Sequence, residues 1–148
     1  MYKRVLVPLD GSGRAEAILP HVEALAKAYD STIVLLRVIE PVSVVVGPHG
    51  MDGHMYLEQV HNMERDVREY LKAKQVSLQH AGFTVEILMM HGTPTEAILL
   101  AVGDENIDLV AMASHGRSGL GTVVFGSVAS GVLHRLEIPM LLIRAWSS

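Results

Sequence analysis

Short apolar runs alternate with segments of helical spacing along the chain. The apolar runs are Val5–Val7, Thr32–Val38, Val85–Met89, Leu109–Met112 and Met140–Ile143. Most of them lack a strict alternation of apolar and polar residues, which is typical of strands buried on both faces. They predict five strands of a parallel sheet.

The segments between these runs predict helices. Apolar residues recur at spacings of three and four between 15 and 29, and Pro20 within this pattern indicates a kink or a late helix start. A longer helix is predicted over 56–81. Its inward residues would be Tyr56, Val60, Met63, Val67, Tyr70, Leu71 and Leu78.

Two further helices have recognisable ends. Thr93–Glu96 has the composition of a capping box with proline at the first helical position, so a helix should begin there and end near Gly103. The last helix follows Gly126. His134 and Arg135 in its final turn suit the negative end of the helix dipole.

This order of elements predicts a single α/β domain over residues 1–148, with three α/β/α layers. Right-handed crossovers place helices on both faces of a parallel sheet. In the strand order 3-2-1-4-5, the first and fourth strands are neighbours where the winding reverses, and ligands bind beyond the carboxyl ends of strands at such points. Asp10 follows the first strand, so it could share one cleft with Gly116 after the fourth.

A glycine-rich loop joins the fourth predicted strand to the last predicted helix. Its glycines let the backbone approach a ligand closely and reach positive φ. The helix start at Gly126 offers unpaired N–H groups and the positive end of the helix dipole to an anion, and the hydroxyl of Ser127 lies beside them. Arg117 adds a positive charge. These features predict phosphate binding, although the loop could also be only a tight connection, and Asp10–Gly13 could serve only as a helix cap.

Composition narrows the class of protein. Charged residues make up 19% of the chain and hydrophobic residues 49%, which indicates a globular domain. The net charge of -4 disfavours a general nucleic-acid binder, and the lack of cysteine excludes disulfides. The chain has neither a signal-peptide core nor an apolar run long enough to span a membrane, so we expect a cytoplasmic protein. The spacing of His49, His54 and His61 matches no zinc pattern, and no metal site formed by side chains is predicted.

The chain resembles the universal stress protein family from end to end. Val5–Ser12 resembles the first strand and acidic turn of the family, and His91–Ile98 its turn into a helix. Ser114–Gly119 and Phe125–Val128 resemble its nucleotide loop, and Ile138–Ile143 its last strand. ATP-binding members carry the pattern Gly-x2-Gly-x9-Gly-Ser/Thr. Gly116, Gly126 and Ser127 match this pattern, whereas Ala113 replaces its first glycine.

The resemblance implies an adenine nucleotide alpha hydrolase-like (Rossmann-like) fold that binds ATP, with Mg²⁺ or Mn²⁺ on the phosphates. The adenosine end would contact Pro8, Leu9, Asp10 and Val38, with Met112 and Ala113 beside adenine and ribose. The phosphates would be held by Gly116, Arg117, Gly126, Ser127 and Val128. The implied role is a nucleotide-linked regulator of the stress response, in which the irregular segment 40–55 responds to the ligand.

Two other functions stay open. One is an enzyme that acts on ATP. Since no general base can be named, we expect at most slow ATP hydrolysis, and the chain lacks the phosphate loop that ATP pyrophosphatases carry after the first strand, which disfavours that class of enzyme. Some relatives lack the nucleotide pattern and act as dimers, so a nucleotide-independent interaction protein is the alternative. In either case we expect a homodimer through the last strand, which is apolar and lies at the edge of the predicted sheet.

Overall fold

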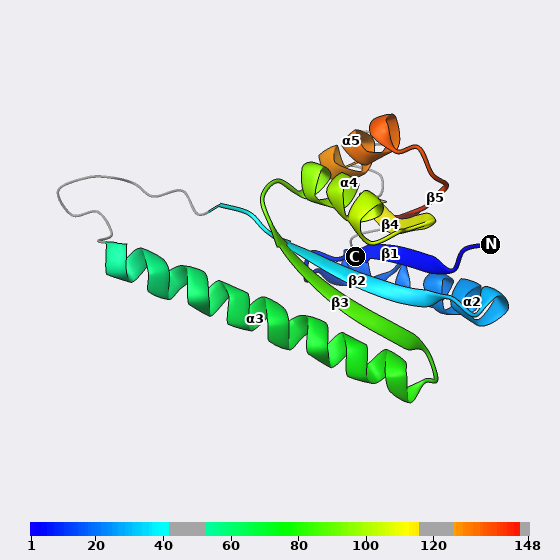
Figure 1. Cartoon of the computed structure of the whole chain (residues 1–148), viewed down its shortest axis with the longest axis horizontal. Coiled ribbons are helices and arrows are strands. Elements are labelled where there is room, and N and C mark those ends of the chain that lie inside the picture. Colours follow the sequence, from blue (N-terminus) through cyan, green and yellow to red (C-terminus); the bar gives the residue numbers. More distant parts are fainter. Residues whose placement is uncertain (42–52, 116–125, 146–148) are drawn as a thin grey trace.

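Five parallel strands form the centre of the molecule in a computed structural model that describes residues 1–41, 53–115 and 126–145. The strands are β1 (Arg4–Pro8), β2 (Thr32–Ile39), β3 (Thr84–His91), β4 (Leu109–His115) and β5 (Met140–Ala145). They form one sheet of order β3-β2-β1-β4-β5 (Figure 1). The predicted order 3-2-1-4-5 is therefore confirmed, and β1 and β4 are the neighbours at which the winding reverses.

Helices cover both faces of the sheet. Successive residues of a strand point to opposite faces, so each central strand contacts both helical layers. Val5 and Val7 of β1 pack with α1 (Gly13–Glu16), α2 (Leu19–Tyr29) and α3 (Gly53–His80). Leu6, which lies between them, packs with α4 (Pro94–Asp104) and α5 (Ser127–Arg135) on the opposite face. Figure 1 shows α3 along one side of the sheet and α4 with α5 on the other. The three-layer α/β/α class is confirmed.

Pro20 marks a late helix start. The segment 15–29 divides into the single turn α1 and the longer α2, and Pro20 lies in the first turn of α2, where its missing N–H costs no helical hydrogen bond. Of the two possibilities for this proline, a kink within one helix and a new start, the structure shows the second.

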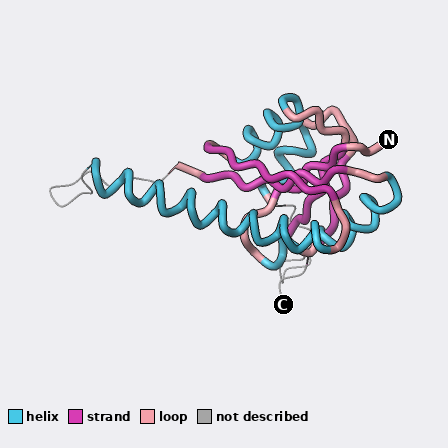
Figure 2. The backbone as a smooth tube through the Cα atoms, turned by 60° about the horizontal axis from the view of Figure 1, so that its bottom comes forward, coloured by secondary structure: helices cyan, strands magenta, loops and turns pink. Residues whose placement is uncertain are grey.

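The long helix α3 extends beyond the sheet at its amino-terminal end (Figures 1 and 2). Its buried residues Val67, Leu71 and Leu78 all lie in its carboxyl-terminal half. The prediction that Tyr56 and Val60 face the core is wrong, since neither belongs to or packs against the two core clusters of the described residues. The reason is that apolar residues keep their helical spacing along α3 beyond the point where the sheet ends. Met63 and Tyr70 are partly buried against the core, as expected.

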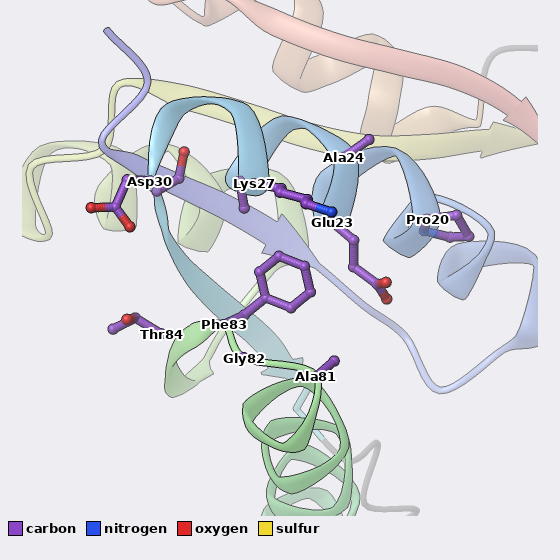
Figure 3. A pocket seen from close by; sticks show the side chains of 11 residues that line it. Pro20, Glu23, Ala24, Lys27, Asp30, Ala81, Gly82, Phe83 and Thr84 are labelled. Carbon is purple, nitrogen blue, oxygen red and sulfur yellow. The ribbon is translucent and has the colours of Figure 1, made fainter.

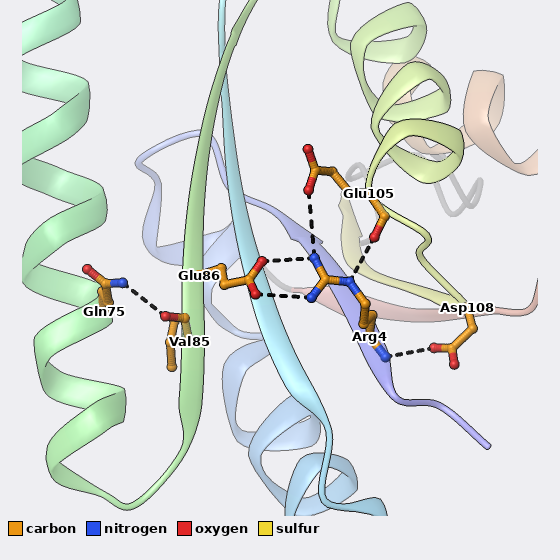
Figure 4. Close-up of polar contacts among 6 residues, drawn as sticks. All are labelled: Arg4, Gln75, Val85, Glu86, Glu105 and Asp108. Carbon is orange, nitrogen blue, oxygen red and sulfur yellow. Dashed lines mark hydrogen bonds and ion pairs between the residues drawn. The ribbon is translucent and has the colours of Figure 1, made fainter.

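A polar cluster ties the amino ends of the strands together (Figure 4). The guanidinium of Arg4 donates two hydrogen bonds to the carboxylate of Glu86 on β3, of 3.0 and 2.8 Å, and Nε donates to the carbonyl of Glu105 at 2.7 Å. The carboxylate of Asp108 accepts from the backbone N–H groups of Lys3 and Arg4. The hydrogen bonds from Arg4 lower the pKa of Glu86 despite partial desolvation. This cluster joins β1 to β3 across β2.

The structure shows no helix within its described ranges that is long and apolar enough to cross a lipid bilayer.

Candidate functional site

A cavity of about 290 Å³ lies at the carboxyl ends of β1, β2 and β4, where α5 begins. Every predicted binding residue that the structure describes lines it, namely Pro8, Leu9, Asp10, Val38, Met112, Ala113, Gly126, Ser127 and Val128. Gly116 and Arg117 lie outside the described residues, as does most of the segment 40–55. The structure thus brings together segments more than 100 residues apart in the chain.

Asp10 is held by the turn that follows β1. Its Oδ1 accepts a hydrogen bond from the backbone N–H of Ser12 at 2.9 Å and another from the Ser12 hydroxyl. The same hydroxyl oxygen accepts from the N–H of Ala15 at 3.1 Å and caps α1. Asp10 therefore supports the helix cap through Ser12, while its exposed carboxylate also borders the cavity.

The charge of Asp10 is stabilised locally. Burial alone would raise the pKa of this carboxyl group, but the hydrogen bonds from Ser12 and the charges of Arg14 and Arg37 outweigh burial and lower it. Nη2 of Arg14 lies 3.6 Å from Oδ2 of Asp10. Asp10 is consequently an ionised hydrogen-bond acceptor at neutral pH.

Two helix N-termini open onto the cavity. The N-cap of α5 is Gly126, which has no side chain to satisfy the first N–H groups of the helix. Pro94 at the start of α4 also lines the cavity, and Thr93 makes no capping hydrogen bond through its side chain. The first N–H groups of a helix and the positive end of its dipole favour an anion, and two helices offer both to this cavity.

The predicted capping box at the start of α4 does not form. The helix begins at Pro94, as predicted, but the carboxylate of Glu96 pairs with the guanidinium of Arg135 on α5 instead of returning to Thr93. This pairing lowers the pKa of Glu96. A cation on the neighbouring helix competes for the carboxylate, and the N-cap Thr93 makes no side-chain capping hydrogen bond.

Arg37 lies between the cavity and α3. Its guanidinium carbon is 5.2 Å from the centroid of the Tyr70 ring, a cation–π distance, and the residue lines the cavity next to Val38. Its Nε is buried and has no hydrogen-bond partner in the ranges described. Nη1 faces Gly11 so closely that a Cβ there would come well under 3.0 Å from it. Arg37 is thus held by packing, without an acceptor for Nε.

Tyr70 is fixed on its other side by α1. Its hydroxyl donates to Oε2 of Glu16 at 2.8 Å, and Lys74 pairs with the other oxygen of the same carboxylate. Burial raises the pKa of Tyr70, and the hydrogen bond to Glu16 raises it further, so the hydroxyl keeps its proton. These contacts connect the wall of the cavity to α3.

A second, larger cavity of about 660 Å³ lies at the opposite ends of the strands, between α2 and the α3–β3 turn (Figure 3). Its lining includes Glu23, Lys27, Asp30 and the ring of Phe83, and none of the predicted binding residues. It adjoins the carboxyl-terminal ends of α2 and α3, where the helix dipoles are negative. Phosphate is disfavoured there, so the smaller cavity is the better candidate for binding an anion.

A family model described as the universal stress protein family matches residues 1–144. The chain belongs to the universal stress protein family. Its similarity therefore spans the sheet, both helical layers and all the strand ends that form the cavity.

One known member is similar to this chain in sequence and fold over nearly its whole length. Universal stress protein MJ0577 of Methanocaldococcus jannaschii is 30% identical over 161 aligned positions, covering 100% of this chain and 98% of the relative. The solved structure of MJ0577 has a TM-score of 0.73 at 29% identity, covering 100% of this chain and 99% of that one.

Two more distant members have been solved with adenine nucleotides. A universal stress protein family protein from Arabidopsis thaliana with AMP bound has a TM-score of 0.67 at 18% identity, covering 97% of this chain and 92% of that chain. A universal stress protein in complex with cAMP has a TM-score of 0.69 at 18% identity, covering 97% of this chain and 98% of that chain. These two structures share the fold of the present chain.

The cavity of this universal stress protein also includes residues that sequence reasoning missed, notably Arg14, Arg37, Glu40 and Pro94. One signal was available for Arg37, which is the single charged residue within the apolar run Thr32–Val38. Arg14 lies four residues after Asp10, a spacing at which side chains on a helix meet. Neither signal predicts a cavity by itself.

Proposed function

We propose that this universal stress protein binds ATP in the cavity formed by β1, β2, β4 and α5, and acts as a nucleotide-linked regulator of the stress response. The observation that carries the proposal is the convergence of nine residues, expected from the family resemblance, on one cavity at the carboxyl ends of the strands. Its volume of about 290 Å³ is close to the lower bound of ligand pockets, roughly 300 Å³.

The proposed orientation follows from the chemistry of the lining. Gly126, Ser127 and Val128 belong to the start of α5, where free N–H groups and the helix dipole suit phosphate oxygens. The ionised carboxylate of Asp10 is an acceptor for ribose hydroxyls, and Val38 and Met112 offer apolar surface to adenine. The AMP and cAMP complexes of the distant members support an adenine nucleotide as the ligand.

The proposal includes Mg²⁺ or Mn²⁺ on the phosphates. No group of three metal-ligating side chains (His, Cys, Asp or Glu) occurs where the structure is described. A hard cation can instead be held by phosphate oxygens and water, with few protein ligands. Ser127 supplies the only hydroxyl among the described lining residues, and it would be the side-chain ligand nearest the phosphates.

We expect ATP hydrolysis to be slow. A general base works best when its pKa lies near the operating pH. The pKa of Asp10 is lowered instead, which makes this carboxylate a weak base. Regulation would then arise because the nucleotide favours one conformation of the protein over another.

Isothermal titration with ATP in the presence of Mg²⁺ tests the proposal. We expect saturable binding that Asp10→Asn weakens by about tenfold, since the substitution removes one charge from a hydrogen-bond acceptor. Gly126→Val places a bulky side chain at the α5 N-terminus and should weaken binding further. Glu23→Gln, which lies in the second cavity, is the matched control and should bind like the native chain. Absence of ATP binding by the native chain would refute the proposal.

The alternative is a dimeric stress protein that does not use nucleotide. It is favoured by one observation: the methyl group of Ala113 lines the cavity at the position where ATP-binding members carry glycine. We also propose a homodimer through β5, which is apolar over Met140–Ile143 and pairs only with β4 in the described sheet. Light scattering at micromolar concentration should give the mass of two subunits, and a mass of one subunit would contradict the dimer.

A further inference from the structure

Two arginine side chains share the cavity wall with the carboxylate of Asp10. Arg14 and Arg37 both line the cavity beside this single carboxylate. Among the described residues, the exposed Glu40 also lines the cavity, and the nearby Glu16–Lys74 pair is neutral overall. Arg14 lies 3.6 Å from Asp10, whereas Arg37 forms no ion pair among the described residues.

Arg37 has donors to offer. Its buried Nε has no hydrogen-bond partner in the described part of the chain, and Arg37 does not share the close approach that Arg14 makes to Asp10. The guanidinium carbon lies 5.2 Å from the centroid of the Tyr70 ring and Nη1 lies beside Gly11, so these packing contacts position the group. A planar guanidinium positioned in this manner is pre-organised to donate two parallel hydrogen bonds to two oxygens of one phosphate.

In nucleotide sites of parallel α/β sheets, a carboxylate binds a free ribose hydroxyl, and an arginine nearby accommodates a phosphate ester on the ribose. This cavity contains both groups. We propose that the cavity prefers an adenine nucleotide that carries a second phosphate on the 2′ or 3′ hydroxyl of its ribose, and that Arg37 recognises this phosphate. The inference rests on the proposed function, because it assumes that adenosine lies beside Asp10.

Titration calorimetry of the native protein with three probes tests the inference: adenosine 5′-monophosphate, adenosine 2′,5′-bisphosphate and adenosine 3′,5′-bisphosphate. We expect at least one bisphosphate to bind about tenfold more tightly than the monophosphate, the gain from a charge-assisted pair of hydrogen bonds. The comparison of the two isomers identifies the hydroxyl that carries the phosphate.

Arg37→Met should reduce this preference, measured as the ratio of bisphosphate to monophosphate affinity in the same variant, to less than about threefold. Lys74→Met is the matched control, because it removes a positive charge from the same side of the sheet at a residue that does not line the cavity. It should retain the preference. Arg37→Lys, which keeps the charge but not the fork, should retain only part of it.

The possible failures are distinguishable. If the native protein binds ATP and the monophosphate but binds both bisphosphates no better, the inference is wrong and the proposed function stands. If the preference exists but survives in Arg37→Met, the assignment to Arg37 is wrong. If no adenine nucleotide binds, the proposed function fails and the inference fails with it. The native comparison decides the outcome even if Arg37→Met does not fold.

Discussion

Gly11 is the position at which a single methyl group should disturb both the backbone and the cavity wall. Its φ is +87°, a conformation that residues with a Cβ rarely adopt, and the guanidinium of Arg37 occupies the space that the Cβ would enter. Gly13, two residues later, has an ordinary φ and nothing within 4 Å of its ideal Cβ position. Gly11→Ala and Gly13→Ala therefore form a matched pair within one turn.

The expected difference can be worked out from these two effects. Left-handed backbone in a residue with a Cβ costs about 1–2 kcal/mol. Displacing Arg37 from the Tyr70 ring removes a cation–π contact of about 0.5–1 kcal/mol. Both variants gain similarly from the lower entropy of their unfolded chains, so this contribution cancels in the comparison. Gly11→Ala should be less stable than Gly13→Ala by about 1.5–3 kcal/mol.

Urea unfolding followed by circular dichroism measures this difference directly. For a chain of this size, the thermal midpoint should differ by about 3–12 °C, because 1 kcal/mol shifts Tm by about 2–4 °C. The double variant Gly11→Ala/Arg37→Met separates the two effects, since only the backbone strain opposes folding once the guanidinium is gone. If the free energies of unfolding of the two alanine variants differ by less than about 0.5 kcal/mol, the range of ordinary surface substitutions, the reasoning on Gly11 is refuted.

Three other outcomes are expected. Arg4→Met should lower the free energy of unfolding, measured in urea, by about 1–2 kcal/mol, because the two hydrogen bonds to the Glu86 carboxylate are lost at a partly exposed site. The control Arg65→Met, on the exposed face of α3, should change this free energy little, and equal losses in the two variants would contradict the assignment. Ala113→Gly should raise ATP affinity by up to roughly tenfold in calorimetry, since it removes a methyl group from the cavity lining, and an unchanged affinity would exclude this methyl as an obstacle. Burial raises the pKa of Glu16, but its hydrogen bonds to Lys74 and Tyr70 outweigh burial and leave the pKa below the ordinary value of 4.5. The stability that Glu16 contributes is therefore present above about pH 4.5 and is lost as the pH falls through the lower pKa of the folded state. Urea titrations between about pH 6 and 3 should show a shallower decline of stability in Glu16→Gln than in the native chain, and parallel curves would rule out this contribution.

Much of the fold could be predicted because strands buried on both faces require apolar runs, and all five runs became strands. The ends of the strands were harder to place. β3 continues to His91, past the predicted end at Met89, because its backbone still pairs with β2 as far as Ile39. Backbone pairing does not depend on whether a side chain is polar. Similarly, apolar residues keep their helical spacing along α3 beyond the edge of the sheet. The spacing of apolar residues within one helix contains no information on where that edge lies.

The candidate site was predictable to the extent that it depends on strand ends and helix starts. Asp10 and Ser127 follow from the rule that ligands bind beyond the carboxyl ends of parallel strands. The capping box at Thr93–Glu96 failed for a tertiary reason, since Arg135 lies 39 residues away in the chain and takes the Glu96 carboxylate. A local motif competes with every partner that the fold brings near, and the sequence alone does not rank these partners.

Arg37 shows why the remaining part of the cavity wall could not be predicted from the sequence. The register pairs Pro8 with Leu36, and the backbone N–H of Leu9 donates to the Leu36 carbonyl at 2.9 Å. The turn after β1 therefore lies against the end of β2, and Gly11 comes to face the guanidinium of Arg37. Since a side chain at 11 would fill the place of that guanidinium, Gly11 must be glycine for two separate reasons. Its positive φ belongs to the local turn, whereas the space it leaves for Arg37 exists only because β1 and β2 pair in this register.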